Sequence, residues 1–475
     1  MRQELALTAS DKRGIVPKQA SVIARGSAST HAVTAVYLLL ATIYHFAPNL
    51  ILVGIPLLGI GLYAAVRGAN ILPHLVVFGY LTHSIVSPNS TKLVFSLPVL
   101  FWVVMQGVRG SSTPKLGVSR IVLGAWACCA GIIMAILLSE LVDPATTTGA
   151  AGPLSRVAYV LLCLTVAWSC VKARTRRQLY LSLTVSALYL SVDIMLRVSA
   201  SGYASARVAF DAADGFIDPN YLAFFILLGL GPCLAVVVGG REFKTSEKFI
   251  AAVCSLVLLG GAAMTTSRTG MIGGTALVVY AVAHLLRHRG VTHAVVALVV
   301  IGGLALVAME QFQNMPTFIE GQERWTGAED VSGLGGRLEL AIASVRSFSS
   351  LGFREMVFGG GTGANYLFNG GWNTHNGFLE YYLDHGLIGG SLLVILFLMA
   401  GANVRVTRDT MASMAGWSTW VTVLLFAMSL GLFSVPYSWV AIAPLLVVVE
   451  SEGSRERAAV RLSVAVSRGY NRKAK

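Results

Sequence analysis

The sequence predicts an all-α polytopic membrane protein with about 12–14 transmembrane helices, cytoplasmic N- and C-termini and one long, partly helical periplasmic loop. The first observation is composition: 55% of the 475 residues are hydrophobic and 12% are charged, whereas soluble domains carry about 25% charged residues. The mean hydropathy is correspondingly high, at +0.69. The second observation is a series of apolar segments long enough to cross a bilayer. The third is an uneven distribution of Lys and Arg between the two sets of connecting loops.

Fourteen apolar segments are candidates for spanning helices, each of which needs about 20 mostly apolar residues. The first two are short and could form one broken or re-entrant element, so twelve spans are an alternative. The predicted spans are 33–47, 49–66, 71–86, 93–108, 120–142, 154–171, 178–196, 219–239, 249–266, 269–286, 291–309, 386–402, 416–433 and 436–450.

Basic residues set the predicted orientation, because loops rich in Lys and Arg stay in the cytoplasm. With a cytoplasmic N-terminus, the short inner loops carry fifteen basic residues and the C-terminal tail, with seven more, falls inside. The short outer loops carry five, namely Lys92, Arg156, Arg197, Arg207 and Arg268. This bias accounts for the formal net charge of +13, so we expect no nucleic-acid partner.

The chain divides into five predicted regions. Residues 1–32 form a basic cytoplasmic tail, which lacks the apolar core and cleavage site of a signal peptide. Transmembrane helices with short loops follow in 33–309, and the long periplasmic loop takes 310–385. The C-terminal transmembrane helices occupy 386–450, and a second basic cytoplasmic tail occupies 451–475.

The long outer loop stands out by its length and charge, and loops of this kind are usually functional. It carries nine acidic residues and four basic residues, and every basic residue is Arg. Apolar residues at helical spacing predict a helix that opens near Arg337. A second helix is expected from His375 to about His385, with Gly386 ending it.

Metal and cofactor chemistry finds little support in the sequence. The six cysteines lie in apolar segments without a CxxC, which favours buried thiols over disulfides or zinc ligands. The outer segments contain no HExxH and no Cys/His cluster, so no metal site and no cofactor is expected. Within the spans Asp193 is the clearest ionisable group, whereas an ion-coupled transporter usually needs several.

Two outer stretches place arginine close to the membrane. In RVAFDAADGFIDPNYLAF, Asp218 and Asn220 are typical helix caps, and Arg207 contacts either a lipid headgroup or an anionic ligand. In TTSRTGMIGG, Ser267 and Arg268 fill a very tight connection between two spans. Because Arg at membrane depth is costly, it usually pairs with an anion or faces a cavity. Arg268 is therefore a candidate functional residue.

Two further stretches lie in the long loop. Arg337 opens a helix, where its charge opposes the helix dipole, and it pairs either with a nearby acid such as Glu339 or with a ligand. The run GGGTG could bind phosphate through backbone amides, but it lacks the Lys-Ser/Thr of a P-loop and reads better as a turn. His375 and Asn376 stand beside the membrane at a helix start that Thr374 or Asn373 could cap. His375 is either a capping or a functional residue.

These stretches form an ordered set: Arg207…Pro219-Asn220, Ser267-Arg268-Thr269-Gly270, Gly336-Arg337, Gly361-Thr362-Gly363, His375-Asn376 and Gly386-Leu387-Ile388-Gly389. The set resembles the O-antigen ligase/polymerase superfamily of bacterial inner-membrane proteins. Each motif alone is weak, but their order and common side are fairly specific. The resemblance implies an inverting, metal-independent glycosyltransferase that moves a glycan from undecaprenyl diphosphate to an acceptor at the periplasmic face.

The resemblance assigns Arg268 first and Arg207 second to the diphosphate of the donor, with Arg337 as a third candidate. Arg197 is an alternative to Arg207, because DGFIDPN departs from the family pattern before its PN pair. The negative charge on the diphosphate grows as the glycosidic bond breaks, and Arg stabilises such charge with a permanent, bidentate donor group.

The resemblance also assigns residues near the acceptor. An imidazole, whose ordinary pKa is about 6.5, can remove the acceptor's proton, so His375 is the candidate general base, or else a binder of phosphate or acceptor. Asn376 is expected to orient the acceptor, and Glu380 to hold the His375 loop or a sugar hydroxyl. Asn220 is a candidate for positioning its loop or the acceptor.

Several alternatives remain at the level of function. A polymerase would pass the chain to the next lipid-linked repeat unit, and a ligase would pass it to lipid A–core; polymerase is slightly favoured. The expected partners are the lipid-linked donor, one of these acceptors, the bilayer and, for a polymerase, a chain-length regulator.

A flippase or exporter of lipid-linked sugar is the competing class, since basic groups lining a cavity would serve it too. A membrane scaffold would not need Arg268 in a tight turn.

Overall fold

The computed structural model describes the chain in segments. The described residues are, besides a few isolated positions, 54–67, 120–142, 152–170, 173–201, 219–239, 243–312, 331–368, 374–407, 410–434 and 436–447. The chain forms two compact units, Met1–Pro114 and Lys115–Lys475. In the first, the main described element is α3 (Ile55–Arg67), which coincides with the predicted span 49–66. The spans predicted at 71–86 and 93–108 and both tails lie outside the described residues.

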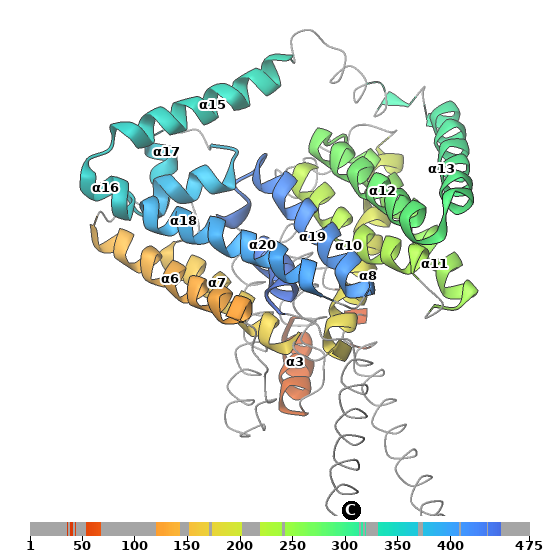
Figure 1. Ribbon diagram of the computed structural model, residues 1–475, viewed down its shortest axis with the longest axis horizontal. Coiled ribbons are helices and arrows are strands. Elements are labelled where there is room, and N and C mark those ends of the chain that lie inside the picture. Colours follow the sequence, from red (N-terminus) through yellow and green to blue (C-terminus); the bar gives the residue numbers. More distant parts are fainter. Residues whose placement is uncertain are drawn as a thin grey trace, which may run out of the picture. The chain divides into compact units, whose positions relative to one another are not determined.

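The described part of the second unit is built from helices and contains no strand (Figure 1). The all-α class predicted from composition is thereby confirmed. In chain order the elements are α6 (Arg120–Val142), α7 (Pro153–Ser169), α8 (Ala173–Ala200), α10 (Pro219–Val238), α11 (Thr245–Met264), α12 (Arg268–Arg289), α13 (Val291–Phe312), α15 (Val331–Ser350), α16 (Phe353–Phe358), α17 (Ala364–Phe368), α18 (Gly377–Val406), α19 (Thr410–Ala427), η4 (Leu432–Ser434), α20 (Pro436–Ile442) and η5 (Ala443–Leu446).

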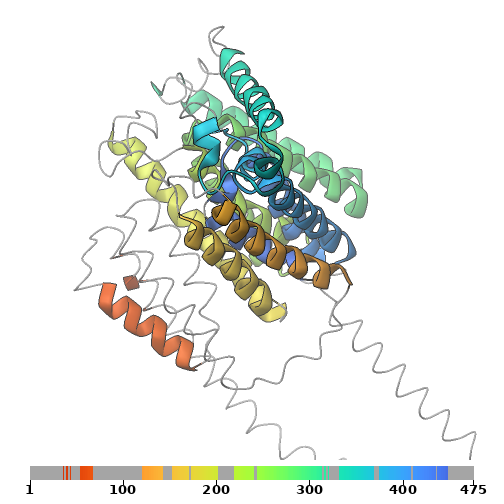
Figure 2. The same cartoon turned by 90° about the vertical axis from the view of Figure 1, so that its left-hand side faces the viewer.

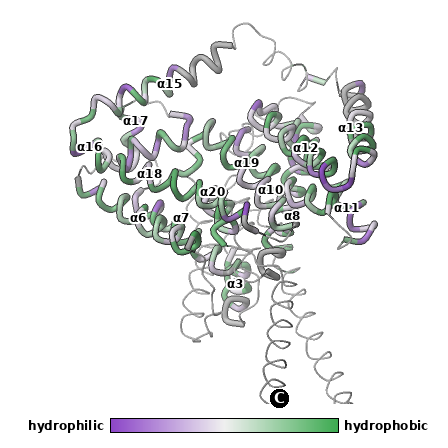
Figure 3. Tube along the Cα trace, viewed as in Figure 1, coloured by the Kyte–Doolittle hydropathy of each residue, from purple (hydrophilic) through white to green (hydrophobic). Residues whose placement is uncertain are grey.

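Among the described residues, six helices are long and apolar enough to cross a membrane. Figure 3 shows hydrophobic residues along much of their length. Shorter apolar helices occur at Pro153–Trp168 and Met411–Ala427. The protein is therefore a polytopic membrane protein, as predicted, while the total of 12–14 spans and the sidedness of the loops remain predictions. The six candidates are Ile121–Leu141, Leu179–Ala200, Pro219–Val238, Thr245–Met264, Arg268–Arg289 and Gly377–Arg405.

Helix α10 is the most enclosed of these candidate spans, with 83% of its apolar window buried. Its sequence is apolar on every side, which is typical of a helix surrounded by other helices. It contacts α8, α11, α12 and α19. Gly229 lies against Ala187 of α8, and Gly231 lies against Ser418 of α19. Small residues at these contacts allow the helix backbones to approach closely.

Helix α18 packs along α6, although the two are far apart in the sequence. Figure 1 and Figure 2 both show them side by side. Gly124 of α6 faces the end of the Met399 side chain, so again a glycine sits where two helices meet. Helix α7 lies beside α6 and also contacts α20 and η5. This arrangement brings residues near 140–160 against residues near 380 and 440.

A break divides α18 into two halves. His385 (φ −125°, ψ 15°) and Gly386 (φ 66°, ψ −169°) leave the helical conformation within it. A Cβ at position 386 would collide with the Val357 carbonyl and the Gly359 amide, and positive φ also favours glycine. The helix end predicted at Gly386 thus exists as a kink. The first half begins at Gly377, two residues later than predicted.

The segment 310–385 contains α15, α16 and α17, so the predicted long loop is partly helical. Helix α15 includes position 337 but begins earlier, at Val331.

One predicted span needs correction. The region 436–450 is described to residue 447 and holds the seven-residue α20 followed by the 3-10 turn η5. Pro444 lacks an amide hydrogen, so a continuous α-helix is disfavoured there.

Candidate functional site

Five of the seven candidate residues have described side chains, and two do not. Arg207 lies outside the described residues. The backbone at Arg337 belongs to α15, but its side chain also lies outside them. The structure therefore gives positions for Asn220, Arg268, His375, Asn376 and Glu380.

A hydrogen bond joins the stretches that hold Asn220 and Ser267, two residues that lie 47 positions apart in the sequence. Ser267 caps α12, because its hydroxyl oxygen accepts a hydrogen bond from the Gly270 amide at 3.0 Å. The same hydroxyl donates to Oδ1 of Asn220, in the first turn of α10, at 2.6 Å. Arg268 is the first residue of α12 and is half-buried. Asn220 therefore anchors the turn that carries Arg268.

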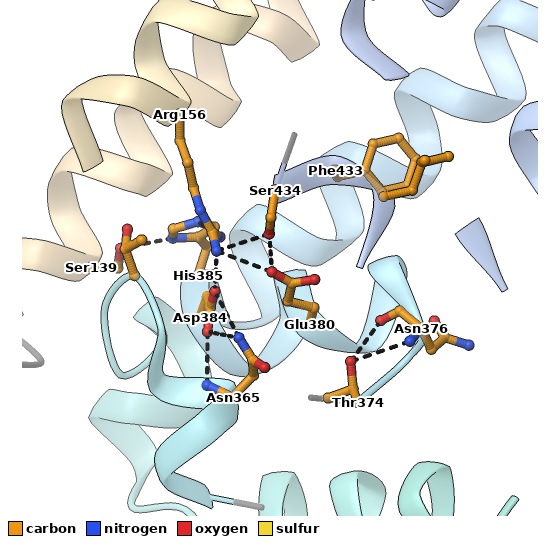
Figure 4. Close-up of polar contacts among 12 residues, drawn as sticks. Ser139, Arg156, Asn365, Thr374, Asn376, Glu380, Asp384, His385, Phe433 and Ser434 are labelled. Carbon is orange, nitrogen blue, oxygen red and sulfur yellow. Dashed lines mark hydrogen bonds and ion pairs between the residues drawn. The ribbon is translucent and has the colours of Figure 1, made fainter. Parts of the chain in front are cut away.

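The loop before α18 is fixed by its own side chains (Figure 4). Asn376 caps the helix, with Oδ1 accepting from the amides of Phe378 and Leu379, both at 3.1 Å. The Thr374 hydroxyl donates to the Asn376 carbonyl at 3.0 Å and accepts from its amide at 3.3 Å. His375, between them, is half-buried. Asn376, rather than Thr374 or Asn373, is thus the N-cap of the helix.

Backbone strain marks the same two stretches. Within the described segments, the non-glycine residues with positive φ are Thr266 (φ 54°) and His375 (φ 49°). Thr266 stands two residues before Arg268, and the other strained residue is the candidate base itself. Left-handed conformations of non-glycine residues persist only where the surroundings impose them, and they cluster at functional sites.

The end of α19 lies between these stretches. Phe426 packs against Phe224 of α10 with tilted rings, at a centroid distance of 5.4 Å, and also lies close to Gly273 of α12. A few residues later, Phe433 and the Leu430 carbonyl crowd Gly377, the first residue of α18. Both candidate stretches therefore pack against one connecting segment, residues 426–433.

A buried charge cluster, which the sequence did not predict, lies beside the first half of α18 (Figure 4). Arg156 of α7 is 1% exposed. Its Nη2 contacts Oδ2 of Asp384 at 2.7 Å and Oε1 of Glu380 at 3.1 Å. The same nitrogen donates to the Ser434 hydroxyl at 3.0 Å, and Nη1 lies 2.9 Å from Nε2 of His385. One guanidinium thus ties α7 to α18 and η4.

The hydrogen bonds define the protonation of His385. Arginine is always a donor, so Nε2 of His385 accepts from Arg156. Nδ1 must then carry the hydrogen and donate to the Ser139 hydroxyl at 2.9 Å, which in turn donates to the Ile136 carbonyl at 2.8 Å. His385 is a neutral imidazole with both nitrogens engaged. It is therefore a structural histidine, and His375 stays the candidate general base.

Glu380 occupies a different place from the expected one. It is 1% exposed and contacts Arg156 and the Ser434 hydroxyl. These partners lie on α7 and η4, whereas we expected the His375 loop or a sugar hydroxyl. Its second oxygen, Oε2, is buried and has no hydrogen-bond partner among the residues that the structure describes.

The glycine-rich run packs onto the kink of α18. Gly359, Gly361 and Gly363 all have positive φ. The amides of Gly360 and Gly361 donate to the carbonyls of Leu383 and Asp384, at 3.1 and 3.0 Å. These two carbonyls precede the kink and have lost their helical partners. The amides that could have held a phosphate are therefore engaged, and the run is a structural turn.

Asp384 is held from a second direction as well. The amide of Asn365, in α17, donates to its Oδ1 at 2.8 Å, and Nδ2 of Asn365 lies 3.1 Å from the same oxygen. One signal for this cluster was present in the sequence. Arg156 is one of the five basic residues assigned to outer loops, where positive charge is disfavoured, and the structure places it in the first turn of the apolar helix α7.

The His, Cys, Asp and Glu side chains of the described segments are arranged as follows. No group of three or more His, Cys, Asp or Glu side chains in the described segments could hold a metal ion. All six cysteines are free thiols, and five of them are buried.

Residues 253–394 match a family described as O-antigen ligase. This segment runs from α11 through the first part of α18 and contains Arg268, Arg337, His375, Asn376 and Glu380. Asn220, Arg207 and Arg156 precede it. The match confirms the resemblance inferred from the ordered motifs. A search of curated proteins gave no match for this chain.

Proposed function

We propose that this protein, which resembles O-antigen ligases over residues 253–394, is a glycosyltransferase of the bacterial inner membrane. It transfers a glycan from undecaprenyl diphosphate to an acceptor at the periplasmic face, by an inverting and metal-independent reaction. One observation carries the proposal: the two strained non-glycine residues, Thr266 and His375, lie in the stretches that hold Arg268 and the His-Asn pair.

Arg268 is proposed to bind the donor diphosphate. It is the first residue of α12, where amide groups and the helix dipole also favour an anion. As the glycosidic bond breaks, its electron pair moves onto the diphosphate oxygen, and the guanidinium stabilises that charge. The Asn220–Ser267 hydrogen bond supports this role, because it fixes the turn. Arg207 and Arg337 are proposed as further contacts to the same group.

His375 is proposed to act on the acceptor. Its imidazole removes the proton of the attacking sugar hydroxyl, which makes the oxygen a better nucleophile. The fixed loop supports this role, because Thr374 and Asn376 hold the backbone on both sides of the imidazole. The amide nitrogen of Asn376 is proposed to orient the acceptor.

A second candidate is a flippase or exporter of lipid-linked sugar. The observation that favours it is the buried cluster of Arg156, Glu380, Asp384 and His385, since ionisable groups inside a membrane protein often line a transport path. Arg156, however, contacts each of the other three members directly. This favours a fixed structural element and so favours the transferase.

The test is reconstitution of the purified protein with lipid-linked oligosaccharide and each acceptor in turn. Lengthened lipid-linked glycan is the expected product and identifies a polymerase of O-antigen or exopolysaccharide. Product formed with lipid A–core alone identifies an O-antigen ligase. If neither product forms while labelled donor crosses the bilayer, the protein is a transporter and the proposal is wrong.

A further inference from the structure

The first half of α18, residues 377–384, has a proposed site at its start and the buried cluster at its end. Asn376 caps its first turn, while Glu380 and Asp384 stand one turn apart on the face that meets Arg156. The kink separates this half from the apolar span that follows. Because the helix is broken there, the direction of 377–384 depends on its side contacts rather than on the span.

These side contacts converge on Arg156. Its guanidinium holds Glu380, Asp384 and His385, which are all the charged or imidazole side chains of this half and its kink. The Ser434 hydroxyl, a fourth partner, comes from the segment that also packs against Gly377. A planar guanidinium meets several acceptors in one fixed geometry, which the single ammonium of lysine cannot reproduce.

We propose that Arg156 is a positioning residue for glycan transfer. By holding Glu380 and Asp384 it fixes the segment 377–384 in the direction that presents His375 and Asn376 to the acceptor. Arg156 itself touches no substrate, since it is 1% exposed. The inference rests on the proposed function, because positioning has meaning only if His375 and Asn376 meet a substrate.

A purely stabilising role makes a different prediction. If the cluster serves only to hold the fold, variants that remain folded keep the turnover number of the wild type. If it positions α18, folded variants lose turnover, because a displacement of about 1 Å at the reacting groups costs up to about 100-fold in rate. The affinity for the donor changes little in that case, since Arg268 lies on a different helix.

Two variants separate these cases. Arg156→Lys keeps the positive charge but loses the forked geometry. Asp384→Asn keeps the shape of the side chain and can still accept from Asn365, but it removes the ion pair. Arg289→Lys is the matched control, because Arg289 also holds a helix end, donating to the Gly239 carbonyl at 2.8 Å, on the face predicted to be cytoplasmic.

The experiment measures kcat and KM for transfer in liposomes, with thermal unfolding as the check on folding. For Arg156→Lys we expect kcat to fall about 100-fold with the donor KM within about twofold, and for Asp384→Asn a fall of about 10-fold. Arg289→Lys should match the wild type. If Arg156→Lys does not fold, Asp384→Asn decides the question. Folded variants with wild-type kcat would overturn the proposal.

Hydrogen exchange separates a failure of this inference from a failure of the proposed function. In both Arg156→Lys and Asp384→Asn, we expect amides of residues 374–384 to exchange faster than in the wild type, while amides of α10 keep their rate. This readout needs no substrate. If the wild type transfers no glycan, the proposed function fails, and exchange still reports on the segment. Unchanged exchange at 374–384 would refute the positioning role.

Discussion

The protein places arginine and histidine in two contrasting settings. Arg268 and His375 are half-buried, stand at helix starts and follow or adopt strained backbone conformations. Arg156 and His385 are buried, and the hydrogen bonds around them link five separate elements. In the first setting, charge and imidazole are proposed to meet a ligand. In the second setting, the guanidinium and the imidazole are bound to other residues of the protein. Residue type alone therefore does not identify a catalytic group, and burial is what separates the two settings.

The largest effect is expected for Arg268→Ala. Without its guanidinium, the leaving diphosphate loses a charged donor, and we expect transfer to fall about 1000-fold or more. Membrane insertion and thermal stability should stay near the wild type. Arg287→Ala, at the exposed other end of α12, is the control and should retain full activity. Substantial transfer by Arg268→Ala would remove this residue from the diphosphate site.

Replacing the buried Arg156 should lower stability, whereas replacing Arg268 should lower activity. Arg156→Leu leaves Glu380 and Asp384 buried without their cation, which costs about 3–5 kcal/mol of folding free energy. Thermal unfolding in detergent measures this loss. The triple change Arg156→Leu/Glu380→Gln/Asp384→Asn removes the unpaired charges and should recover much of the stability. A single variant as stable as the wild type would show that the cluster carries little charge.

For His375→Ala we expect a loss of about 100-fold in kcat, the usual contribution of a general base. A general base accepts a proton only in its neutral form. The wild-type rate should therefore rise with pH as the imidazole loses its proton, and the variant should lack that rise. His293→Ala, at an exposed helix start, serves as the control. An identical pH profile in His375→Ala would rule out the base role and leave binding.

The smallest effect is expected for Asn220→Ala. It removes the hydrogen bond to Ser267, worth about 1 kcal/mol, and loosens the turn that carries Arg268. We expect the donor KM to rise about 5-fold to 10-fold with little change in stability. Ser267→Ala should have a similar effect, and the double variant should be no worse than the stronger single variant. Additive losses would mean that the two residues act independently.

Hydropathy was sufficient to predict much of the fold. The predicted spans 120–142 and 219–239 coincide with α6 and α10, because long uninterrupted apolar runs leave a helix as the only backbone arrangement stable in lipid. The predicted span 436–450 is interrupted for a local reason. Its composition is apolar enough for a spanning helix, but α20 gives way to the 3-10 helix η5, which contains Pro444.

The candidate site was only partly predictable. Ser267, Arg268, His375 and Asn376 were found because tight turns and helix starts leave a local signal in the sequence. The Arg156–Asp384 pair joins residues more than 200 positions apart, and no local pattern reports such a contact. Glu380 was expected to hold the His375 loop or a sugar hydroxyl, whereas its described partners come from α7 and η4.

The most direct test of the central claim follows the diphosphate. Purified protein in liposomes is supplied with doubly labelled lipid-linked oligosaccharide and unlabelled acceptor, and both products are quantified. The account predicts that each glycan transferred releases one undecaprenyl diphosphate, that chelators do not slow the reaction, and that Arg268→Ala abolishes both products together. Movement of intact donor across the bilayer, with no release of undecaprenyl diphosphate, would contradict it.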